Sequence, residues 1–589
     1  MLMEKHVSEV HQLFERVKNE LFNPSIFIGE VKVREKTDKV SFSIKGGLLN
    51  ITLGEKFLQE GEWENVLIWL FRHYLSHIHY CPYDLRTAYE LERAAFQILR
   101  NRELAHISLR FFAELMVDLI YLPYRFLEVP GHLEYIFRRA PKGLEQLLYS
   151  TYKIFYEDHI PDYEVDHLVE GYARDIFLVA RSSKPWLHKQ KLIASIIGRL
   201  IALRGNMKSK PGKLKERFKE RFPGFIPLSE DLRKIGEREV SQVYGEIRDR
   251  DEAKAFYNNW LKPRLRDEEK RIKEVFEREV LAKVKGEKKR GRGYKKKAVE
   301  KREVYRGEEP SLPTSLSSPL SKLKRKAFEE ALWRRYWYKA RAQKILLEYA
   351  LQSRIKRVSF KEETYPEEWR VEDDVEELDI ELTISEGPFI PEVTTAKWAP
   401  KRLEVGSILI PSPAPSLVIV LDSSKSMLSS FDNAATSAFI LYLSAKHAGS
   451  KVSVVNFSTN FIYADWNTDD TAKEIVLSLP MGKYTVFPYP KIEEIMRESP
   501  SEPFLMIITD GGWQNFGETL QWLIRIRKEG FKVLIFHLYG WKYDQNIKLL
   551  KEKARVNVIR VDRPEVDLNR ITLTEAGKRY GPSFYPSWV

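Results

Sequence analysis

The sequence predicts a multidomain α/β protein in which an α+β region, a helical basic region and a parallel-sheet region follow one another along the chain. After Pro411, short and uniformly apolar strands alternate with helices, which is typical of a parallel sheet with helices on both faces. Residues 1–181 contain a β-rich segment followed by a long helical run, and residues 182–357 are helical, charged and basic. A chain of 589 residues is long enough for two to four domains.

The composition describes a charge-rich globular protein without a disulfide framework. Hydrophobic residues make up 43% of the chain and charged residues 31%, a balance that also occurs in thermophile proteins. The single cysteine, Cys81, excludes an intrachain disulfide and favours a reducing compartment, so we expect a cytoplasmic protein. No apolar run approaches the roughly 20 residues of a membrane span, and the N-terminus lacks the apolar core of a signal peptide.

Within residues 1–181, the apolar pattern predicts strands at 26–33, 40–44 and 48–53. Apolar residues at helical spacing then predict helices throughout residues 62–125. We therefore expect an α+β domain in this part of the chain.

The middle region, residues 182–357, contains the strongly basic segment 283–306 in a chain of net charge +13. The Pro- and Ser-rich residues 308–319 follow, so we expect a mobile linker at about 283–320. Basic residues at this density suit phosphate contacts, and the aromatic residues at 333–338 suit stacking on bases. Solvated charge and helix packing are the alternative interpretation. A nucleic-acid site of this kind would use Lys288, Lys289, Arg290, Arg292, Lys295, Lys296 and Lys297.

Residues 358–410 are acidic and are predicted to form strands and loops. Their acidic run, residues 372–381, is opposite in sign to the basic segment that precedes it. Docking of one on the other would reduce the charge that either offers to an outside partner.

The last region, residues 411–589, alternates between strands and helices. Because parallel strands covered on both faces are apolar throughout, we expect a Rossmann-like sheet with helices on both faces. The predicted strands span residues 417–421, 452–457, 504–509, 533–538 and 556–561, and the predicted helices span residues 434–448 and 518–528.

Two of these strands end in carboxylates. Asp422 follows the first strand in the sequence Asp-Ser-Ser-Lys-Ser, and Asp510 follows the third. Ligands bind at the carboxyl ends of strands in open α/β sheets. The alternation of Asp422, Ser424 and Ser426 places three side chains on one side of an extended loop. Oxygen ligands of this kind suit Mg²⁺, Mn²⁺ or Ca²⁺ and not Zn²⁺.

This arrangement resembles the metal-ion-dependent adhesion site of von Willebrand factor A (VWA) domains. That family has an Asp-x-Ser-x-Ser loop after the first strand, a Thr in a later loop and an Asp after the fourth strand. Thr485, in the segment MGKYTVF, matches the Thr, although its loop departs from the commoner Gly-Gly-Thr form. The resemblance implies one coordination position for the carboxylate of a partner protein. It also implies direct metal contacts from Ser424, Ser426 and Thr485, and contacts mainly through water from Asp422 and Asp510.

The acidic region narrows the resemblance to one subgroup of VWA proteins. The segments PEEW at 366–369 and IPEVTT at 390–395, together with the acidic run between them, resemble the lead-in of bacterial and archaeal VWA proteins associated with MoxR-type AAA+ ATPases. In that group the VWA protein is an adaptor, often the partner of a hexameric ATPase that remodels or activates client complexes. We therefore expect a MoxR-type AAA+ ATPase, a client protein that offers a carboxylate, or both as partners.

A second candidate site lies at FRHYLSHIHYCPYD, residues 71–84. His73 and His77 are four residues apart, so they share a face of the predicted helix. This is the spacing of H-E-x-x-H zinc proteases, but Tyr74 stands where the general base would be. The region resembles a degenerate, non-catalytic zincin metallopeptidase domain, and the resemblance implies Asp118, or Glu114, as the third ligand.

Three interpretations of these histidines remain open: a degenerate scaffold without metal, a structural Zn²⁺ held by both histidines and an acidic residue, and ordinary core histidines. Peptidase activity needs a base that the motif lacks. Cys81 lies in no protease signature and is not expected to act as a nucleophile.

The chain contains neither of the glycine-rich nucleotide-binding motifs, so it is not expected to bind nucleotide or to be an ATPase itself. We expect a non-enzymatic adaptor that binds partner proteins through Mg²⁺ (or Mn²⁺ or Ca²⁺) in the VWA domain. The alternatives are a zinc-binding, peptidase-like protein and a protein that binds nucleic acid through its basic middle region.

Overall fold

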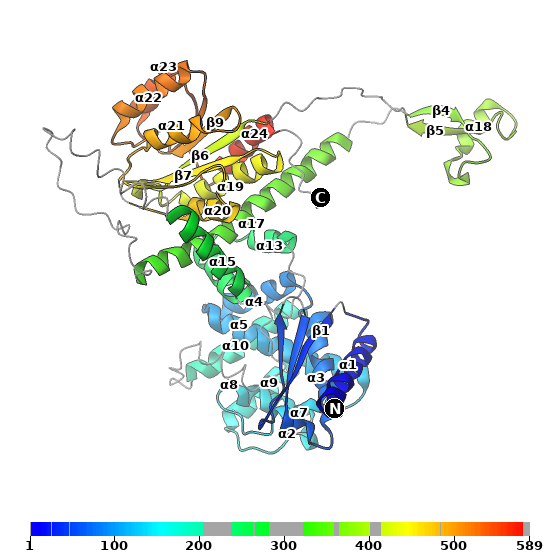
Figure 1. Ribbon diagram of the computed structural model, residues 1–589. Helices are drawn as coiled ribbons and strands as arrows, with labels where there is room; N and C mark the ends of the chain where they lie inside the picture. The colour runs from blue at the N-terminus through cyan, green and yellow to red at the C-terminus, as the bar shows by residue number, and fades with distance from the viewer. Residues whose placement is uncertain are drawn as a thin grey trace. The chain divides into compact units, whose positions relative to one another are not determined.

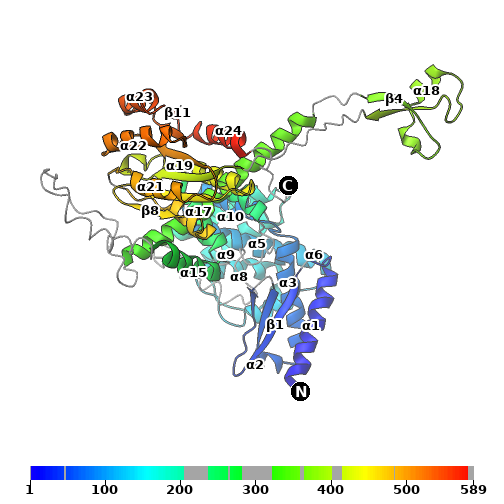
Figure 2. The same cartoon turned by 45° about the horizontal axis from the view of Figure 1, so that its top comes forward.

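The computed structural model describes residues 2–24, 26–45, 48–203, 237–262, 265–281, 322–358, 364–400, 414–482 and 484–580. The chain divides into two compact units (Figure 1 and Figure 2). The first comprises residues 1–274 and 332–340, and the second comprises residues 275–331 and 341–589. The basic segment and the seven residues proposed to contact nucleic acid lie outside the described ranges.

The first unit begins with helix α1 (Leu2–Glu20) and a three-stranded sheet. Strand β3 (Leu48–Gly54) is central, with β1 (Phe27–Arg34) parallel to it on one side and β2 (Ser41–Lys45) antiparallel on the other. Alternate side chains of β3 are buried, as expected for a strand with one face on the core. The three predicted strands are confirmed, each within one residue of its predicted ends.

Helices cover this sheet and form the rest of the core. Helix α3 (Trp63–His79) carries the two histidines and is buried along most of its length. Helix α10 (Trp186–Leu203) packs on α4 (Leu85–Leu99) and α9 (His167–Arg181), so the unit continues beyond the boundary expected at residue 181. The other helical elements here are α2 (Glu55–Leu58), α5 (Arg102–Leu115), the π-helix η1 (Met116–Tyr121), α6 (Leu122–Phe126), α7 (His132–Ile136), α8 (Leu144–Phe155) and the 3₁₀ helix η2 (Glu157–His159).

The described parts of the middle region are helical, as predicted. Its long helix α17 (Lys322–Val358) carries the aromatic cluster, in which Trp333 and Trp337 are buried. The indole of Trp337 donates a hydrogen bond to the backbone carbonyl of Ile247 at 2.8 Å, so these rings pack inside the protein and are not presented to bases. The region also contains α13 (Glu237–Tyr244), α14 (Arg250–Phe256), η3 (Tyr257–Leu261), α15 (Arg266–Phe276) and η4 (Glu277–Leu281). None of the helices in the described ranges is long and apolar enough to cross a membrane.

The acidic region forms a small module. Strands β4 (Thr364–Glu368) and β5 (Ala396–Pro400) pair antiparallel, and the short helices η5 (Val375–Glu377) and α18 (Ile380–Glu386) lie between them in the sequence. Few of its side chains are buried, because so short a segment encloses little core.

The second unit is built on a six-stranded sheet of order β11-β10-β9-β6-β7-β8. All neighbouring strands pair in parallel except β7 and β8, which are antiparallel. The central strands are buried at every position, which explains why they are apolar throughout. The strands are β6 (Ser416–Asp422), β7 (Val452–Phe457), β8 (Phe461–Ala464), β9 (Pro503–Thr509), β10 (Lys532–Leu538) and β11 (Asn557–Val561).

Helices cover both faces of this sheet, which gives the Rossmann-like arrangement that the sequence predicts (Figure 1). Helices α21 (Tyr489–Arg497), α22 (Phe516–Lys528) and α23 (Asp544–Glu552) share one apolar core with the sheet. Helix α19 (Phe431–His447) contacts β6 on the other face and packs between α20 (Asp470–Ser478) and α24 (Leu568–Tyr580).

Candidate metal centres

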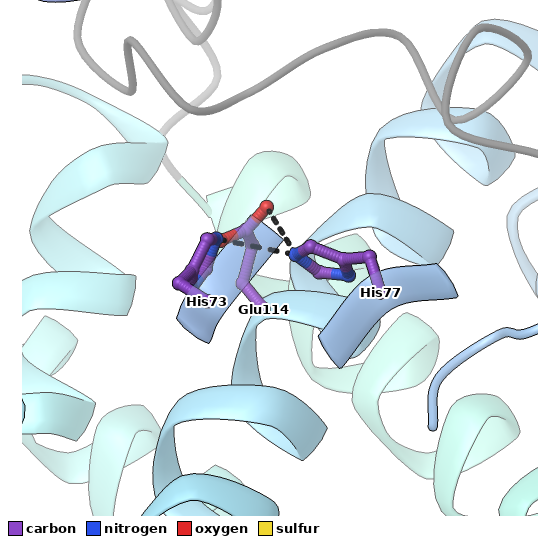
Figure 3. A group of neighbouring side chains, drawn as sticks. All are labelled: His73, His77 and Glu114. Carbon is purple, nitrogen blue, oxygen red and sulfur yellow. Dashed lines mark hydrogen bonds and ion pairs between the residues drawn. The ribbon is translucent and has the colours of Figure 1, made fainter. Parts of the chain in front are cut away.

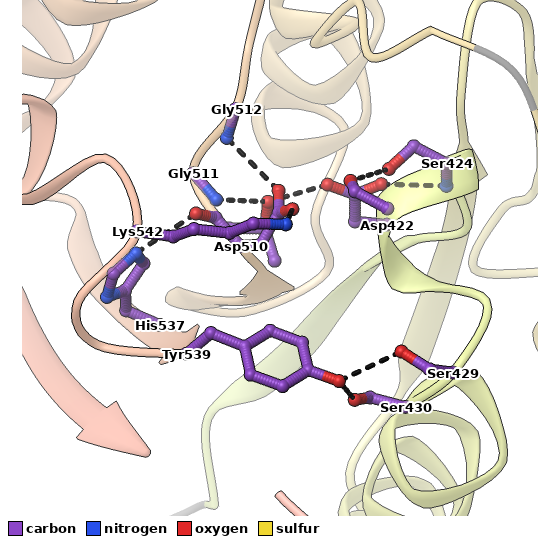
Figure 4. Close-up of polar contacts among 12 residues, drawn as sticks. Asp422, Ser424, Ser429, Ser430, Asp510, Gly511, Gly512, His537, Tyr539 and Lys542 are labelled. Atoms are coloured by element: carbon purple, nitrogen blue, oxygen red, sulfur yellow. Dashed lines mark hydrogen bonds and ion pairs between the residues drawn. The ribbon is translucent and has the colours of Figure 1, made fainter. Parts of the chain in front are cut away.

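Two carboxylates lie at the carboxyl edge of the six-stranded sheet, where the chain changes direction across it. After β6 the chain continues to β7 on one side, whereas β9 pairs with β6 on the other side. Asp422 is the last residue of β6, and Asp510 follows β9 directly (Figure 4). Ligands bind at such switch points in open α/β sheets.

Hydrogen bonds fix the Asp422 carboxylate from two sides. Its Oδ1 accepts from the amide of Ser424 at 2.9 Å, and its Oδ2 accepts from the hydroxyl of Thr509 at 2.6 Å. The hydroxyl oxygens of Ser424 and Ser426 lie 3.2 Å apart. Asp422 is fully buried, and this burial, with Asp510 nearby, raises the pKa of its carboxyl to about 7.

Asp510 has one carboxylate oxygen without a hydrogen bond. Its Oδ1 accepts from the amide of Gly512 at 3.1 Å. Its Oδ2 is buried, and no group in the described part of the chain donates a hydrogen bond to it. Lys542 Nζ lies 3.7 Å away. A buried carboxylate oxygen that receives no hydrogen bond destabilises the fold, and a bound cation relieves that cost.

The loop that carries Thr485 is tied to the same edge of the sheet. The amide of Gly482 donates to the carbonyl of Ser423 at 2.8 Å, and the amide of Gln514 donates to the carbonyl of Thr485 at 2.9 Å. The loop thus bonds to the Asp-x-Ser-x-Ser loop on one side and to the segment after β9 on the other. Thr485 itself is 6% exposed.

The chemistry of this group fits a hard divalent cation. Two carboxylates and nearby hydroxyls supply oxygen ligands only, which suits Mg²⁺, Mn²⁺ or Ca²⁺. Oδ2 of Asp510, which receives no hydrogen bond from the described residues, is where such an ion would be stabilised. Thr509 and Lys542 were not predicted, since Thr509 belongs to a strand pattern and Lys542 to no motif.

Thr509→Val is expected to destabilise the protein by about 1–3 kcal/mol, because one hydroxyl serves three partners. Besides donating to Asp422, Thr509 Oγ1 accepts from the amide of Gly511 at 3.0 Å and from the indole of Trp513 at 3.1 Å. Valine keeps the shape but leaves both donors without an acceptor. Chemical unfolding followed by circular dichroism measures the change, with the exposed Thr574→Val as control. Equal stability of the two variants would contradict this role.

The second candidate centre lies inside the first unit, between α3 and α5. His73, His77 and Glu114 are each 3% exposed and point toward one another (Figure 3). The Nε2 atoms of the two histidines are 3.2 Å apart. Glu114 Oε2 lies 3.2 Å from His73 Nε2, and Glu114 Oε1 lies 3.6 Å from His77 Nε2. Three potential ligands therefore converge on one point.

The outer nitrogens of both imidazoles are held by acceptors. His77 Nδ1 lies 3.0 Å from the carbonyl oxygen of Cys81, and His73 Nδ1 lies 2.7 Å from Asp118 Oδ1. A carbonyl oxygen only accepts, so Nδ1 of His77 carries hydrogen and its Nε2 presents a lone pair to the centre. Carboxylates and carbonyls behind metal-bound histidines orient the rings in this way.

The structure places Asp118 behind His73, whereas Glu114 faces both inner nitrogens. Asp118 also accepts from the hydroxyl of Tyr152 at 2.8 Å and lies 3.3 Å from His132 Nε2. Burial raises the pKa of Asp118, but the imidazoles of His73 and His132 outweigh this effect and hold the pKa below its usual range. His73, Asp118 and His132 form a second close set of possible ligands. No sequence motif indicated His132.

No protein-family model matches the chain, and no curated protein matches it. Its structure is similar to parts of solved structures that are less than 25% identical in sequence. These include the pilus adhesin SpaC from Lactobacillus rhamnosus GG in its open conformation, with 13% identity and a TM-score of 0.25 over 28% of this chain and 30% of that chain. A von Willebrand factor type A protein from Catenulispora acidiphila has 16% identity and a TM-score of 0.23, over 29% of this chain and 43% of that one.

Proximal thread matrix protein 1 from the mussel byssus has 15% identity and a TM-score of 0.24, over 28% of this chain and 46% of that one. The present chain therefore spans less than half the length of each of these three relatives. The second unit itself is a mixed α/β fold with a mostly parallel, six-stranded sheet.

Proposed function

We propose that the second unit binds a divalent cation, Mg²⁺ in the first place, and through it docks a carboxylate of another protein. The observation that carries the proposal is that two fully buried carboxylates, Asp422 and Asp510, lie at the switch point of the sheet, and that Oδ2 of Asp510 receives no hydrogen bond from the described part of the chain. The hydroxyls of Ser424, Ser426 and Thr485 would complete the ligand set. The resemblance implies that these three hydroxyls contact the ion directly and that both carboxylates act mainly through water. The ion then keeps positive charge on its open side, which favours an anionic partner group.

In this proposal the chain is a non-enzymatic adaptor whose partner is an AAA+ ATPase of MoxR type, a client protein, or both. The resemblance of the acidic region to the lead-in of ATPase-associated VWA proteins supports this partner class. The module at residues 364–400 also exposes apolar side chains, among them Val375 and Ile384, that a partner would cover. We propose no catalytic step, because Tyr74 occupies the position of the general base in the histidine motif.

Retention of a partner by the full-length chain tests this function. The tagged chain is incubated with lysate of its source cells in Mg²⁺ or in EDTA, beside Asp422→Asn, and bound proteins are identified by mass spectrometry. We expect an AAA+ ATPase or a client complex to be retained by the wild type in Mg²⁺ only. Equal retention in EDTA and by the variant would contradict a metal-dependent adaptor.

We further propose that the first unit holds a structural Zn²⁺ at His73, His77 and Glu114. An ion bound at about 2.0–2.1 Å to three ligands at tetrahedral angles separates their atoms by about 3.3–3.4 Å. The observed separations of 3.2, 3.2 and 3.6 Å are close to that spacing. Glu114 Oε2 receives no hydrogen bond within the described ranges, although it is buried.

A proton competes with zinc for this position. Burial lowers the pKa of His73, but the carboxylates of Asp118 and Glu114 outweigh it and raise that pKa well above the ordinary value. Burial lowers the pKa of His77 to about 4. Without an ion, His73 therefore carries a proton, and its positive charge partly offsets the two carboxylates. Metal analysis of the purified full-length chain decides whether zinc or a proton occupies the position. We expect one zinc per chain, and a chain that takes up no zinc contradicts the proposal.

A further inference from the structure

The loop between β10 and α23, residues 539–543, lies against the candidate site of the second unit (Figure 4). On one side, the hydroxyl of Tyr539 lies 3.0 Å from the hydroxyl of Ser429. On the other side, the side-chain amide of Asn546, in the first turn of α23 directly after the loop, donates to the carbonyl of Gly511 at 3.2 Å. The loop is therefore anchored to both of the segments that follow the carboxylate-bearing strands.

Lys542 is the cation that this loop brings to the site. Its Nζ lies 3.7 Å from Oδ2 of Asp510, the oxygen that no described group supplies with a hydrogen bond. Asp510 is fully buried, whereas the side chain of Lys542 is 32% exposed. The ammonium group thus lies at the border between the site and solvent, on a flexible four-carbon stem that allows it to move in either direction.

We propose that Lys542 is an internal cation that neutralises Asp510 when no divalent ion is bound, so that the ammonium group and the ion exclude each other. This rests on the proposed function, because it takes the site to bind a divalent cation. A divalent ion bound to Oδ2 of Asp510 and an ammonium group 3.7 Å from the same oxygen would repel each other strongly, because the position is partly buried. Asp510 is therefore neutralised either by the divalent ion or by the ammonium group of Lys542, but not by both at once.

Displacement of the ammonium group has a consequence for the partner. The loop remains anchored through Tyr539 and Asn546, so Lys542 stays at the rim of the site and turns toward solvent. A carboxylate that binds the ion then meets a second positive group nearby. The site with its ion bound therefore favours acidic peptide segments with a further carboxylate next to the one that binds the ion.

Titration of the full-length chain with Mn²⁺ by calorimetry tests the exclusion. Lys542→Met keeps the length of the side chain and removes its charge. We expect it to bind Mn²⁺ about five-fold or more tightly than the wild type, a change within the usual range of coupling between sites. Lys542→Arg keeps the charge and should stay near the wild type. The control is Lys548→Met on α23, because this exposed lysine lies 4.0 Å from Glu552 and forms no ion pair with Asp422 or Asp510.

Thermal unfolding supplies a second readout. Without divalent ions, Lys542→Met should unfold at a lower temperature than the wild type, because Asp510 loses its neighbouring cation, and saturating Mn²⁺ should remove that difference. A wild type that binds no Mn²⁺ overturns the proposed function and this inference together. A wild type that binds Mn²⁺ while Lys542→Met binds it equally or more weakly overturns only the role of Lys542.

Discussion

Asp422→Asn is expected to abolish the stabilisation of the protein by Mg²⁺ and, at the same time, to stabilise the metal-free protein at pH 8. The fully buried carboxylate lies near Asp510, and two ionised carboxylates in such a place oppose folding. Asparagine removes the charge at nearly constant shape, so a gain on the order of 1–3 kcal/mol is expected without metal. The stabilisation by ligand, about 2.7 kcal/mol at an ion concentration of 100 times Kd, should disappear.

Thermal unfolding of both proteins, with and without Mg²⁺, measures the two opposite changes. Asp544→Asn is a suitable control, since this aspartate lies at the start of α23 with a largely exposed side chain. It should keep the response of the wild type to Mg²⁺. An Asp422→Asn protein that responds to Mg²⁺ like the wild type would exclude Asp422 as a ligand.

The same carboxyl predicts how the metal-free protein responds to pH. Its folded pKa of about 7 lies above the value of about 3.9 expected in the unfolded chain. The stability that the protonated group contributes is therefore fully present below about pH 4 and is lost as the pH rises through about 7. The advantage of Asp422→Asn should grow over this interval, and Mg²⁺ binding should strengthen as the proton leaves. A pH series of unfolding curves for both proteins checks the direction.

Glu114→Gln and His77→Gln are expected to lose zinc and, with it, much of the stability of the first unit. An ion present at 1,000 times its Kd contributes about 4 kcal/mol, and either variant removes a ligand from a buried site. Asp118→Asn is expected to keep the ion but to bind it about 10–100 times more weakly, because this residue orients His73 and does not face the centre. Elemental analysis and unfolding in the presence of a zinc chelator measure both effects.

His106→Gln is the matched control for the zinc variants. His106 is also 3% exposed, and its Nδ1 lies 2.8 Å from Glu92 Oε2, yet it belongs to no cluster of possible ligands among the described residues. This variant should lose stability without losing zinc. If Glu114→Gln and His77→Gln prove no more destabilised than His106→Gln and the wild type contains no zinc, the cluster holds a proton in place of a metal.

The sequence predicts the central strands of the second unit closely because each is apolar along its whole buried length, as in β6 and β9. It does not indicate β8, a four-residue edge strand that is only partly buried. The sequence also does not predict the order of the strands in the sheet. The positions of Asp422 and Asp510 directly after strands were nevertheless enough to predict that the two carboxylates lie at one edge. Pairing of β6 with β9 places them there.

Spacing alone could not choose between Glu114 and Asp118. The two residues are four positions apart, so both lie on the face of the helical segment that meets α3. Which of them faces the inner nitrogens depends on the relative placement of α3, α5 and the π-helix η1, and this is set by packing over the whole unit. The contact between Lys542 and Asp510 could not be predicted from the sequence for a similar reason, since only the path of the loop brings the two residues together.

The hydrogen bond between Thr509 and Trp513 gives this protein an optical reporter of its own. The indole is 4% exposed and is joined to Asp422 through a single hydroxyl group. Any change in the charge of that carboxylate, whether by protonation or by coordination, alters the field on a buried fluorophore two hydrogen bonds away. Intrinsic tryptophan emission should therefore report the occupancy of the site in the unlabelled protein, and Trp513→Phe identifies its share of the signal.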